Sequence, residues 1–167
     1  LWVKQRLVWQ EEWVSLYQSA SSVIKAKKPF ILVTGHRREN FGERLQEICQ
    51  GITRIAKTYP DWHIVYPVHL NPKVKKPVHE LLAAYENVHL IDPLEYAPFI
   101  YLMTQSSIVL TDSGGIQEEA PALGKPVLVM REKTERPEAV AAGTVSLVGA
   151  NADKIFHSVS ALINDEV

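Results

Sequence analysis

The 167-residue sequence lacks several features that would indicate a membrane, an oxidising compartment or a metal centre. It has a single cysteine, Cys49, so no disulfide can form within the chain. No apolar run approaches the roughly 20 residues that a helix needs to cross a bilayer. No basic segment followed by an apolar stretch marks a signal peptide, and neither an HExxH motif nor a Cys and His cluster is present. We therefore expect a cytosolic protein with no metal ion and no other cofactor.

An excess of charge of one sign is also missing. Lys and Arg number 18 against 19 Asp and Glu, which gives a net charge of -1. A protein with balanced charge has no overall field that attracts nucleic acid or an anionic membrane. We expect neither as a partner, so any bound anion must be held by a local site.

The sequence does contain an alternation of short apolar runs and segments of helical period. Six runs are continuously apolar, as in strands buried on both faces of a parallel sheet, and they cover residues 30–34, 63–66, 88–91, 107–111, 126–130 and 145–148. Apolar residues recur at helical spacing within 45–56, 74–85, 99–103 and 155–163. Joined by right-handed crossovers, these elements predict an α/β fold with a doubly wound, Rossmann-like parallel sheet.

The first residues do not follow this alternation. Trp2, Trp9 and Trp13 lie on a roughly helical pattern, which predicts an extra helix whose aromatic face packs on the domain or on a partner. We expect a helical extension over residues 1–29 and one domain over residues 30–167, whose length and apolar content suffice for one core.

Ligands of an open parallel sheet bind beyond the carboxyl ends of its strands, where the strand order reverses. The loop after the fourth predicted strand contains Ser113, Gly114 and Gly115, just before a helix predicted to begin near Ile116. A glycine pair lets the backbone approach a ligand, and the N–H groups at a helix start suit a phosphate or diphosphate. Taken alone, the three residues are explained slightly better by a bare turn.

Two carboxylates favour a nucleotide at this loop. Glu118 and Glu119 follow in the first turn of the predicted helix. They can simply complement the helix dipole, or the one that faces the cleft can accept hydrogen bonds from ribose hydroxyls.

Other loops at the same edge contribute ionisable side chains. Residues 36–39 directly follow the first strand, and four ionisable residues there are hard to explain by packing. Among them, His36 can act as a general acid, donate a hydrogen bond to a leaving group or cap a helix. His69 lies in a proline-flanked loop, where a turn histidine is an equally good explanation. Arg136 lies in a charged loop. Such a loop is usually solvated, but an arginine at a helix start on this edge of the sheet can bind a phosphate.

Four motifs carry a resemblance to a known family: TGHRRENFGERLQEIC, YPVHLNP, TDSGGIQEEAPALGKPVLVMRE and TERPEAVAAGTVSLVG. In this order they resemble the bacterial non-hydrolysing UDP-N-acetylglucosamine 2-epimerases, over residues 30–165 but not 1–25. The resemblance implies a full enzyme with two Rossmann-like domains of the GT-B type, of which this chain is similar to the second. It also implies that the first domain supplies further active-site carboxylates and that the full enzyme is a homodimer.

The resemblance also implies an activity and a site. The family interconverts UDP-N-acetylglucosamine and UDP-N-acetylmannosamine for surface polysaccharide synthesis, by eliminating UDP and adding it back on the other face. The implied residues are His36 for catalysis; Ser113, Gly114, Gly115, Glu119, Arg136, Phe99 and Leu94 for binding UDP and the UDP-sugar; and Arg37 and His69 for a second, activating UDP-N-acetylglucosamine in some members. Leu94 stands where some relatives have a glutamine that contacts uracil.

Two other functions use the same nucleotide site. A GT-B glycosyltransferase would transfer the sugar to an acceptor, and a non-catalytic UDP-sugar sensor would keep Ser113 and Glu119 but tolerate loss of His36. No isolated carboxylate is aligned to remove the C2 proton of the sugar. We therefore expect the bases in the other domain and no epimerisation by this chain alone.

Overall fold

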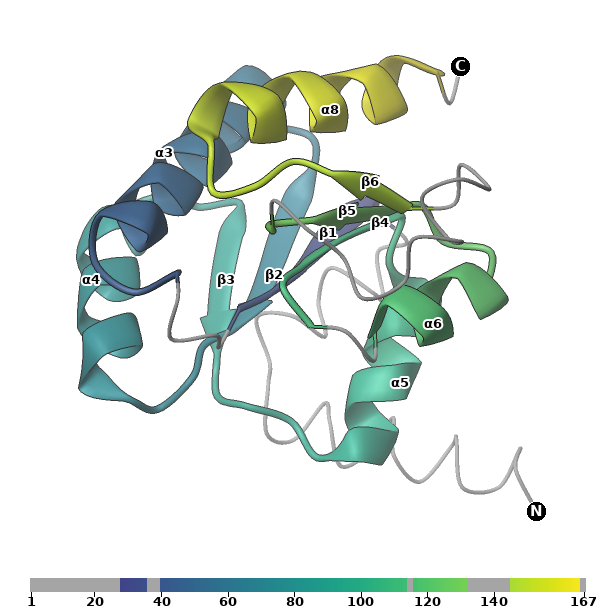
Figure 1. Ribbon diagram of the computed structural model, residues 1–167, viewed down its shortest axis with the longest axis horizontal. Helices are drawn as coiled ribbons and strands as arrows, with labels where there is room; N and C mark the ends of the chain where they lie inside the picture. The colour runs from purple at the N-terminus through teal and green to yellow at the C-terminus, as the bar shows by residue number, and fades with distance from the viewer. Residues whose placement is uncertain (1–27, 36–39, 114–115, 132–144, 166–167) are drawn as a thin grey trace.

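The computed structural model describes residues 28–35, 40–113, 116–131 and 145–165 (Figure 1). Within these residues, six strands form one sheet in the order β3-β2-β1-β4-β5-β6, and all neighbours are parallel. They are β1 (Phe30–Thr34), β2 (His63–Pro67), β3 (Val88–Ile91), β4 (Ile108–Thr111), β5 (Val127–Val129) and β6 (Val145–Leu147). The chain steps outward from β1 to β3 and returns beside β1 with β4. The predicted doubly wound, Rossmann-like sheet is confirmed.

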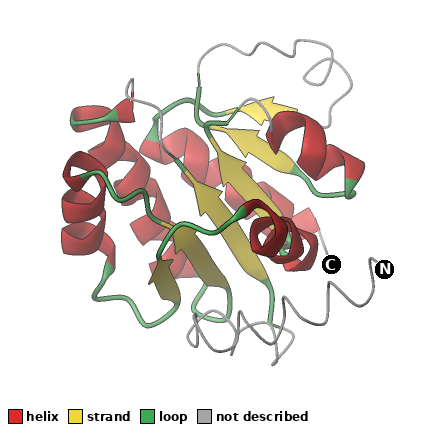
Figure 2. Ribbon diagram, turned by 90° about the horizontal axis from the view of Figure 1, so that it is seen from below, coloured by secondary structure: helices red, strands yellow, loops and turns green. Residues whose placement is uncertain are grey.

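Helices cover both faces of the sheet (Figures 1 and 2): one face carries α3 (Glu43–Thr58), α4 (Pro72–Leu82) and α8 (Ala152–Asp165), and the other carries α5 (Tyr96–Gln105) and α6 (Ile116–Ala122). In β1, Ile31 and Val33 belong to the first core, and Phe30 and Leu32 to the second. Successive residues of a strand point to opposite faces, so a strand between two helical layers is apolar at every position.

The predicted burial on both faces holds for the centre of the sheet but not for its edges. All residues of β1, β4 and β5 are buried. The edge strands β3 and β6 have partly exposed residues, among them Leu90 and Leu147. An edge strand has one neighbour and less helix above it, so a short apolar run does not guarantee full burial.

Two helices differ in extent from the predictions. The helix α4 ends at Leu82 rather than Tyr85, although the Tyr85 side chain still packs against the first core. The helix α5 begins at Tyr96 and so contains Pro98 in its first turn, where a missing N–H removes no helical hydrogen bond. The strands β4 and β5 begin one residue later than predicted.

The helices α3 and α8 pack closely because Gly51 has no side chain at their contact. A Cβ on Gly51 would lie 3.1 Å from the Cβ of Ile155 and 3.3 Å from the Cα of Ala152. The apolar stripe predicted over 45–56 faces the sheet and includes Cys49, whose side chain is fully buried. Burial raises the pKa of the Cys49 thiol to about 12, so the thiol stays protonated at neutral pH.

A histidine pair lies near the amino-terminal ends of β2 and β3. The Nδ1 of His63 and the Nε2 of His89 are 2.9 Å apart and share a hydrogen bond, and the two rings stack. Burial, and then repulsion from His63, lowers the pKa of His89 to about 4. Burial and the nearby Lys28 also lower the pKa of His63. Both histidines therefore have a structural place between the two strands.

The predicted helical extension over residues 1–29 lies almost entirely outside the described residues and stays a prediction. Among the helices that the structure does describe, none combines the length and the apolar character needed to cross a bilayer.

Candidate functional site

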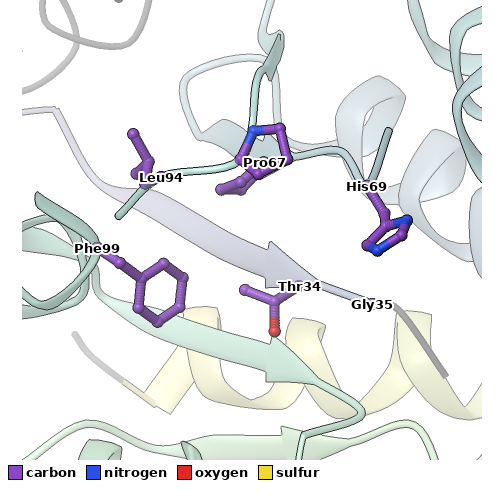
Figure 3. A pocket seen from close by; sticks show the side chains of 7 residues that line it. Thr34, Gly35, Pro67, His69, Leu94 and Phe99 are labelled. Atoms are coloured by element: carbon purple, nitrogen blue, oxygen red, sulfur yellow. The ribbon is translucent and has the colours of Figure 1, made fainter. Parts of the chain in front are cut away.

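A pocket of about 160 Å³ opens at the carboxyl ends of β1 and β2 (Figure 3). Its lining comes from the ends of these two strands, the loop after β2, the loop after β3 and the helix α5, and consists of Thr34, Gly35, Pro67, His69, Pro93, Leu94 and Phe99. The predicted site residues Leu94 and Phe99, which are close in the sequence, thus come together with His69 from the loop after β2.

The pocket is mainly apolar, with polar groups only at particular points. The Phe99 ring and Leu94 lie toward one end in Figure 3, and His69 lies at the other. The Nδ1 of His69 accepts a hydrogen bond from the backbone N–H of Asn71 at 3.1 Å, so the proton of a neutral ring is on Nε2. A concave apolar surface with an aromatic ring and few polar groups suits a planar organic group.

The ends of β1 and β4 are held together where the strand order reverses. Thr34 pairs with Thr111 in the sheet, and their hydroxyl oxygens are 2.6 Å apart. The same Thr111 oxygen accepts a hydrogen bond from the backbone N–H of Ser113 at 3.0 Å, and the Asp112 N–H donates to the Thr34 carbonyl at 3.3 Å. The backbone is therefore fixed up to Ser113, the first of the three residues predicted to bind a diphosphate.

A buried polar cluster lies beneath these strand ends. The Nδ2 of Asn40 donates to Oδ2 of Asp112 at 3.0 Å, and Nε of Arg44 donates to Oδ1 of Asn40 at 3.2 Å. The fully buried Tyr66 hydroxyl has no hydrogen-bond partner within the described part of the chain. Burial, with smaller effects of Cys49 and Asp112, raises the pKa of Tyr66 far above its ordinary value, so its hydroxyl is neutral.

Glu119 lies on α6 and is half-buried. Its Oε1 accepts a hydrogen bond from the hydroxyl of Tyr96, the first residue of α5, at 3.4 Å. A carboxylate has several acceptor positions, so this long contact leaves Glu119 able to accept further hydrogen bonds. The contact brings Glu119 next to the helix that carries Phe99.

Five predicted site residues fall outside the described residues, namely His36, Arg37, Gly114, Gly115 and Arg136. Their predicted roles stay predictions. The positions next to them are described: Gly35 lines the pocket, Asn40 belongs to the buried cluster, and Ser113 and Ile116 flank the glycine pair.

Sequence reasoning did not single out Thr34, Asn40, Tyr66, Tyr96 or Asp112. Each lies in or beside a loop at the carboxyl ends of the strands, where ligands of a parallel sheet bind. That position was the available indication in the sequence. For Asp112 the signal was stronger, because a carboxylate ends a buried apolar run. Over the residues that the structure describes, no group of three or more His, Cys, Asp or Glu side chains could hold a metal ion.

The sheet order and the loops gathered at its reversal point define a Rossmann-like α/β domain. The family model described as UDP-N-acetylglucosamine 2-epimerase matches residues 5–167, and the chain belongs to this family. The match begins well before residue 30, so the predicted limit of the resemblance was too narrow. Residues 5–29 contain none of the four motifs that carried the resemblance.

Three comparisons with known proteins describe the relationship. The UDP-N-acetylglucosamine 2-epimerase of Escherichia coli K12 is 54% identical over 166 residues, which are 99% of this chain and 44% of that protein. A crystal structure of UDP-GlcNAc 2-epimerase from Neisseria meningitidis bound to UDP-GlcNAc has a TM-score of 0.81 and 51% identity, and the match covers 93% of this chain and 43% of that one. The chain therefore spans less than half the length of these relatives.

The third comparison concerns the fold alone. The C-terminal domain of a group 1 glycosyltransferase from Francisella tularensis has a TM-score of 0.63 at 19% identity, and the match covers 83% of that domain. The predicted likeness to the second domain of a GT-B fold is thereby confirmed as a statement about fold.

Proposed function

We propose that this chain is the nucleotide-binding part of an enzyme that interconverts UDP-N-acetylglucosamine and UDP-N-acetylmannosamine by eliminating UDP and adding it back. The observation that carries the proposal is the pocket at the carboxyl edge of the sheet, where Leu94 and Phe99 lie together. Family membership and the UDP-GlcNAc bound to the Neisseria meningitidis relative support it.

The arrangement of α5 and α6 supports adjacent sites for the base and the ribose. Tyr96 and Phe99 are three residues apart on α5 and therefore on one side of the helix. The Tyr96 hydroxyl contacts Glu119, so the Glu119 carboxylate lies beside the helix that carries Phe99. We assign uracil to Phe99 and Leu94, and the ribose hydroxyls to Glu119.

The diphosphate is assigned to Ser113, Gly114 and Gly115, with Arg136 as a counter-charge. Breaking the bond between sugar C1 and UDP places negative charge on the diphosphate, and preorganised N–H donors with a guanidinium stabilise that charge better than water does. His36 follows β1 and is assigned to donate a proton or a hydrogen bond during bond breaking. The base that removes the C2 proton is assigned to the part of the relatives that this chain does not span.

Regulation and assembly belong to the same proposal. His69 lies on the same pocket as Phe99, so a second UDP sugar held by His69 and Arg37 would lie beside the first. A cytosolic location and a homodimer of the full-length enzyme complete the proposal.

Titration and proton exchange on the isolated chain test this assignment. We expect calorimetry to detect UDP binding, because the proposed nucleotide site lies on one sheet. We expect proton NMR of UDP-N-acetylglucosamine in D2O to show no loss of the C2 proton, because the base is assigned to the part of the relatives that this chain does not span. Loss of that signal would place a competent base within this chain, and absence of UDP binding would reject the site.

A chimera tests the activity itself. Joined to the preceding part of the Escherichia coli relative, the chain should form UDP-N-acetylmannosamine. The His36→Asn variant should lose far more turnover than UDP affinity. Replacing a residue that acts mainly in the transition state lowers the rate more than it weakens ground-state binding. Sugar transfer to an acceptor without epimerisation would instead indicate a glycosyltransferase.

A further inference from the structure

A buried hydrogen bond joins the loop after β1 to the end of β4. Asn40 donates to Asp112 at 3.0 Å, and the two side chains are 3% and 0% exposed. Asn40 directly follows residues 36–39, and Asp112 directly precedes residues 113–115. We propose that Asn40 and Asp112 are positioning residues, whose hydrogen bond fixes the loop of His36 relative to the diphosphate loop. This inference rests on the proposed function.

The amide of Asn40 is held in one orientation. Its Oδ1 accepts from Arg44 on α3, and its Nδ2 donates to Asp112. Turning the amide over would bring oxygen toward a carboxylate and nitrogen toward a guanidinium, which places two acceptors and two donors face to face. The interaction therefore specifies one geometry between α3 and β4.

Stability alone does not explain a carboxylate at this position. Burying a charge destabilises a fold unless hydrogen bonds compensate, and an apolar pair of similar volume is often as stable. The hydrogen bonds between buried polar side chains instead favour a single arrangement of the segments that they join. Here those segments are the two loops at the reversal point of the sheet.

Gly35 connects this cluster with the pocket. A Cβ on Gly35 would lie 3.5 Å from the Tyr66 hydroxyl and 3.7 Å from Oδ2 of Asp112, so its backbone packs directly on the cluster. Gly35 also lines the pocket that holds Phe99 and His69. Asp112 also donates its backbone N–H to the carbonyl of Thr34, which lines the same pocket. Neither Asn40 nor Asp112 lines that pocket, and both border a separate cavity of about 10 Å³ beside Gly35.

Exchanging the two partners tests the proposal. Asn40→Asp brings two carboxylates together, and we expect calorimetry to show UDP affinity reduced by about tenfold or more, as for loss of a hydrogen bond to a charged group. In the double variant with Asp112→Asn, a donor and an acceptor face each other again with their roles reversed, and Arg44 keeps its acceptor. We expect this variant to recover most of the lost affinity.

Asn87→Asp is the matched control. The Nδ2 of Asn87 donates to the carbonyl oxygens of Ala56 and Trp62 at 3.0 Å, just before β3 and therefore at the amino-terminal end of the strands. This change also removes amide donors from inside the fold, so it should lower the free energy of unfolding while UDP affinity stays unchanged. If Asn40→Asp does not fold, Asn40→Ala removes the bond without adding a charge and takes its place.

Two results would overturn the positioning role: wild-type UDP affinity in a folded Asn40 variant, or a double variant that binds no better than Asn40→Asp. If the wild-type chain fails to bind UDP, the proposed function fails, and NMR decides the positioning role separately. The Ser113 amide and His36 ring signals should then shift in Asn40→Asp and return in the double variant. Signals that stay in place would reject the role.

Discussion

Glu119 allows nucleotide recognition to be tested at a single residue. Its carboxylate is assigned to the ribose, and pyrophosphate has no ribose. Glu119→Gln should therefore weaken UDP binding by about 1.5–3 kcal/mol, as for hydrogen bonds to a charged group, and leave pyrophosphate binding nearly unchanged. Calorimetric titration with both ligands measures the difference. Tyr96→Phe, which removes only the 3.4 Å contact to Glu119, serves as the control and should have a smaller effect. Equal losses for both ligands would place Glu119 away from the ribose.

Tyr66 is a second residue whose replacement gives a definite expectation. Its buried hydroxyl has no hydrogen-bond partner among the described side chains and backbone groups. A buried polar group without a partner destabilises a fold by about 1–3 kcal/mol, so Tyr66→Phe should keep or raise the free energy of unfolding in urea. Ser106→Ala provides the contrast, because the buried Ser106 hydroxyl donates to the Met103 carbonyl at 2.7 Å and its loss should be destabilising. A clear loss of stability in Tyr66→Phe would contradict this expectation.

The sequence predicted individual site residues unevenly. His69 was found in a loop that follows a strand, whereas Leu94 and Phe99 were named through the family resemblance. The structure brings the three residues to one pocket. Asn40 and Asp112 were not found, because a polar residue near a loop is exposed or buried depending on which strands become neighbours. That neighbourhood is a property of the tertiary fold.

At the scale of elements, helix propensity and packing have opposite effects at Gly51, where α3 contacts α8. Alanine favours a helix over glycine by about 0.8–1 kcal/mol. A Cβ on Gly51 would nevertheless lie 3.1 Å from Ile155, and overpacking costs about 1–3 kcal/mol. We expect Gly51→Ala to lower the free energy of unfolding measured in urea. Gln50→Ala, on the exposed side of the same helix, should not lower it. Stabilisation by Gly51→Ala would show that α8 moves away without loss.

The histidine pair on β2 and β3 should make the free energy of unfolding depend on pH. The pKa of His89 is about 4 in the folded chain and 6.5 ordinarily, so between these values the unfolded chain binds more protons. Stability from the neutral His89 is fully present above pH 6.5 and is lost as pH falls toward 4. His63 acts in the same direction because its pKa is also lowered.

We therefore expect His89→Gln to flatten the fall in the free energy of unfolding with pH across this window. Urea unfolding at several pH values measures it, and His157→Gln on the exposed side of α8 controls for removal of a histidine. An unchanged slope in His89→Gln would contradict the role of the pair.

At the scale of the whole molecule, periodicity predicted the number and kind of elements well, because the central strands are apolar on both faces. It did not determine the ends of β4 or α4, since one residue more or less changes little burial. The sheet order was also not contained in the apolar pattern. The pairing of β1 with β4 joins Thr34 to Thr111 across the intervening β2 and β3 units. Only that pairing brings the two proposed ligand loops together.

The burial of Cys49 makes its alkylation a probe of how often the fold opens around α3. Only the thiolate reacts with alkylating reagents, and the Cys49 thiol is both enclosed and protonated. Iodoacetamide should therefore label only molecules in which α3 has separated from the sheet, at a rate that follows the population of that open state. Mass spectrometry should show slow labelling in buffer and rapid labelling in urea, while fast labelling in buffer would contradict the burial. Because the sequence has no second thiol, each adduct records one opening of the same helix, even in an unpurified lysate.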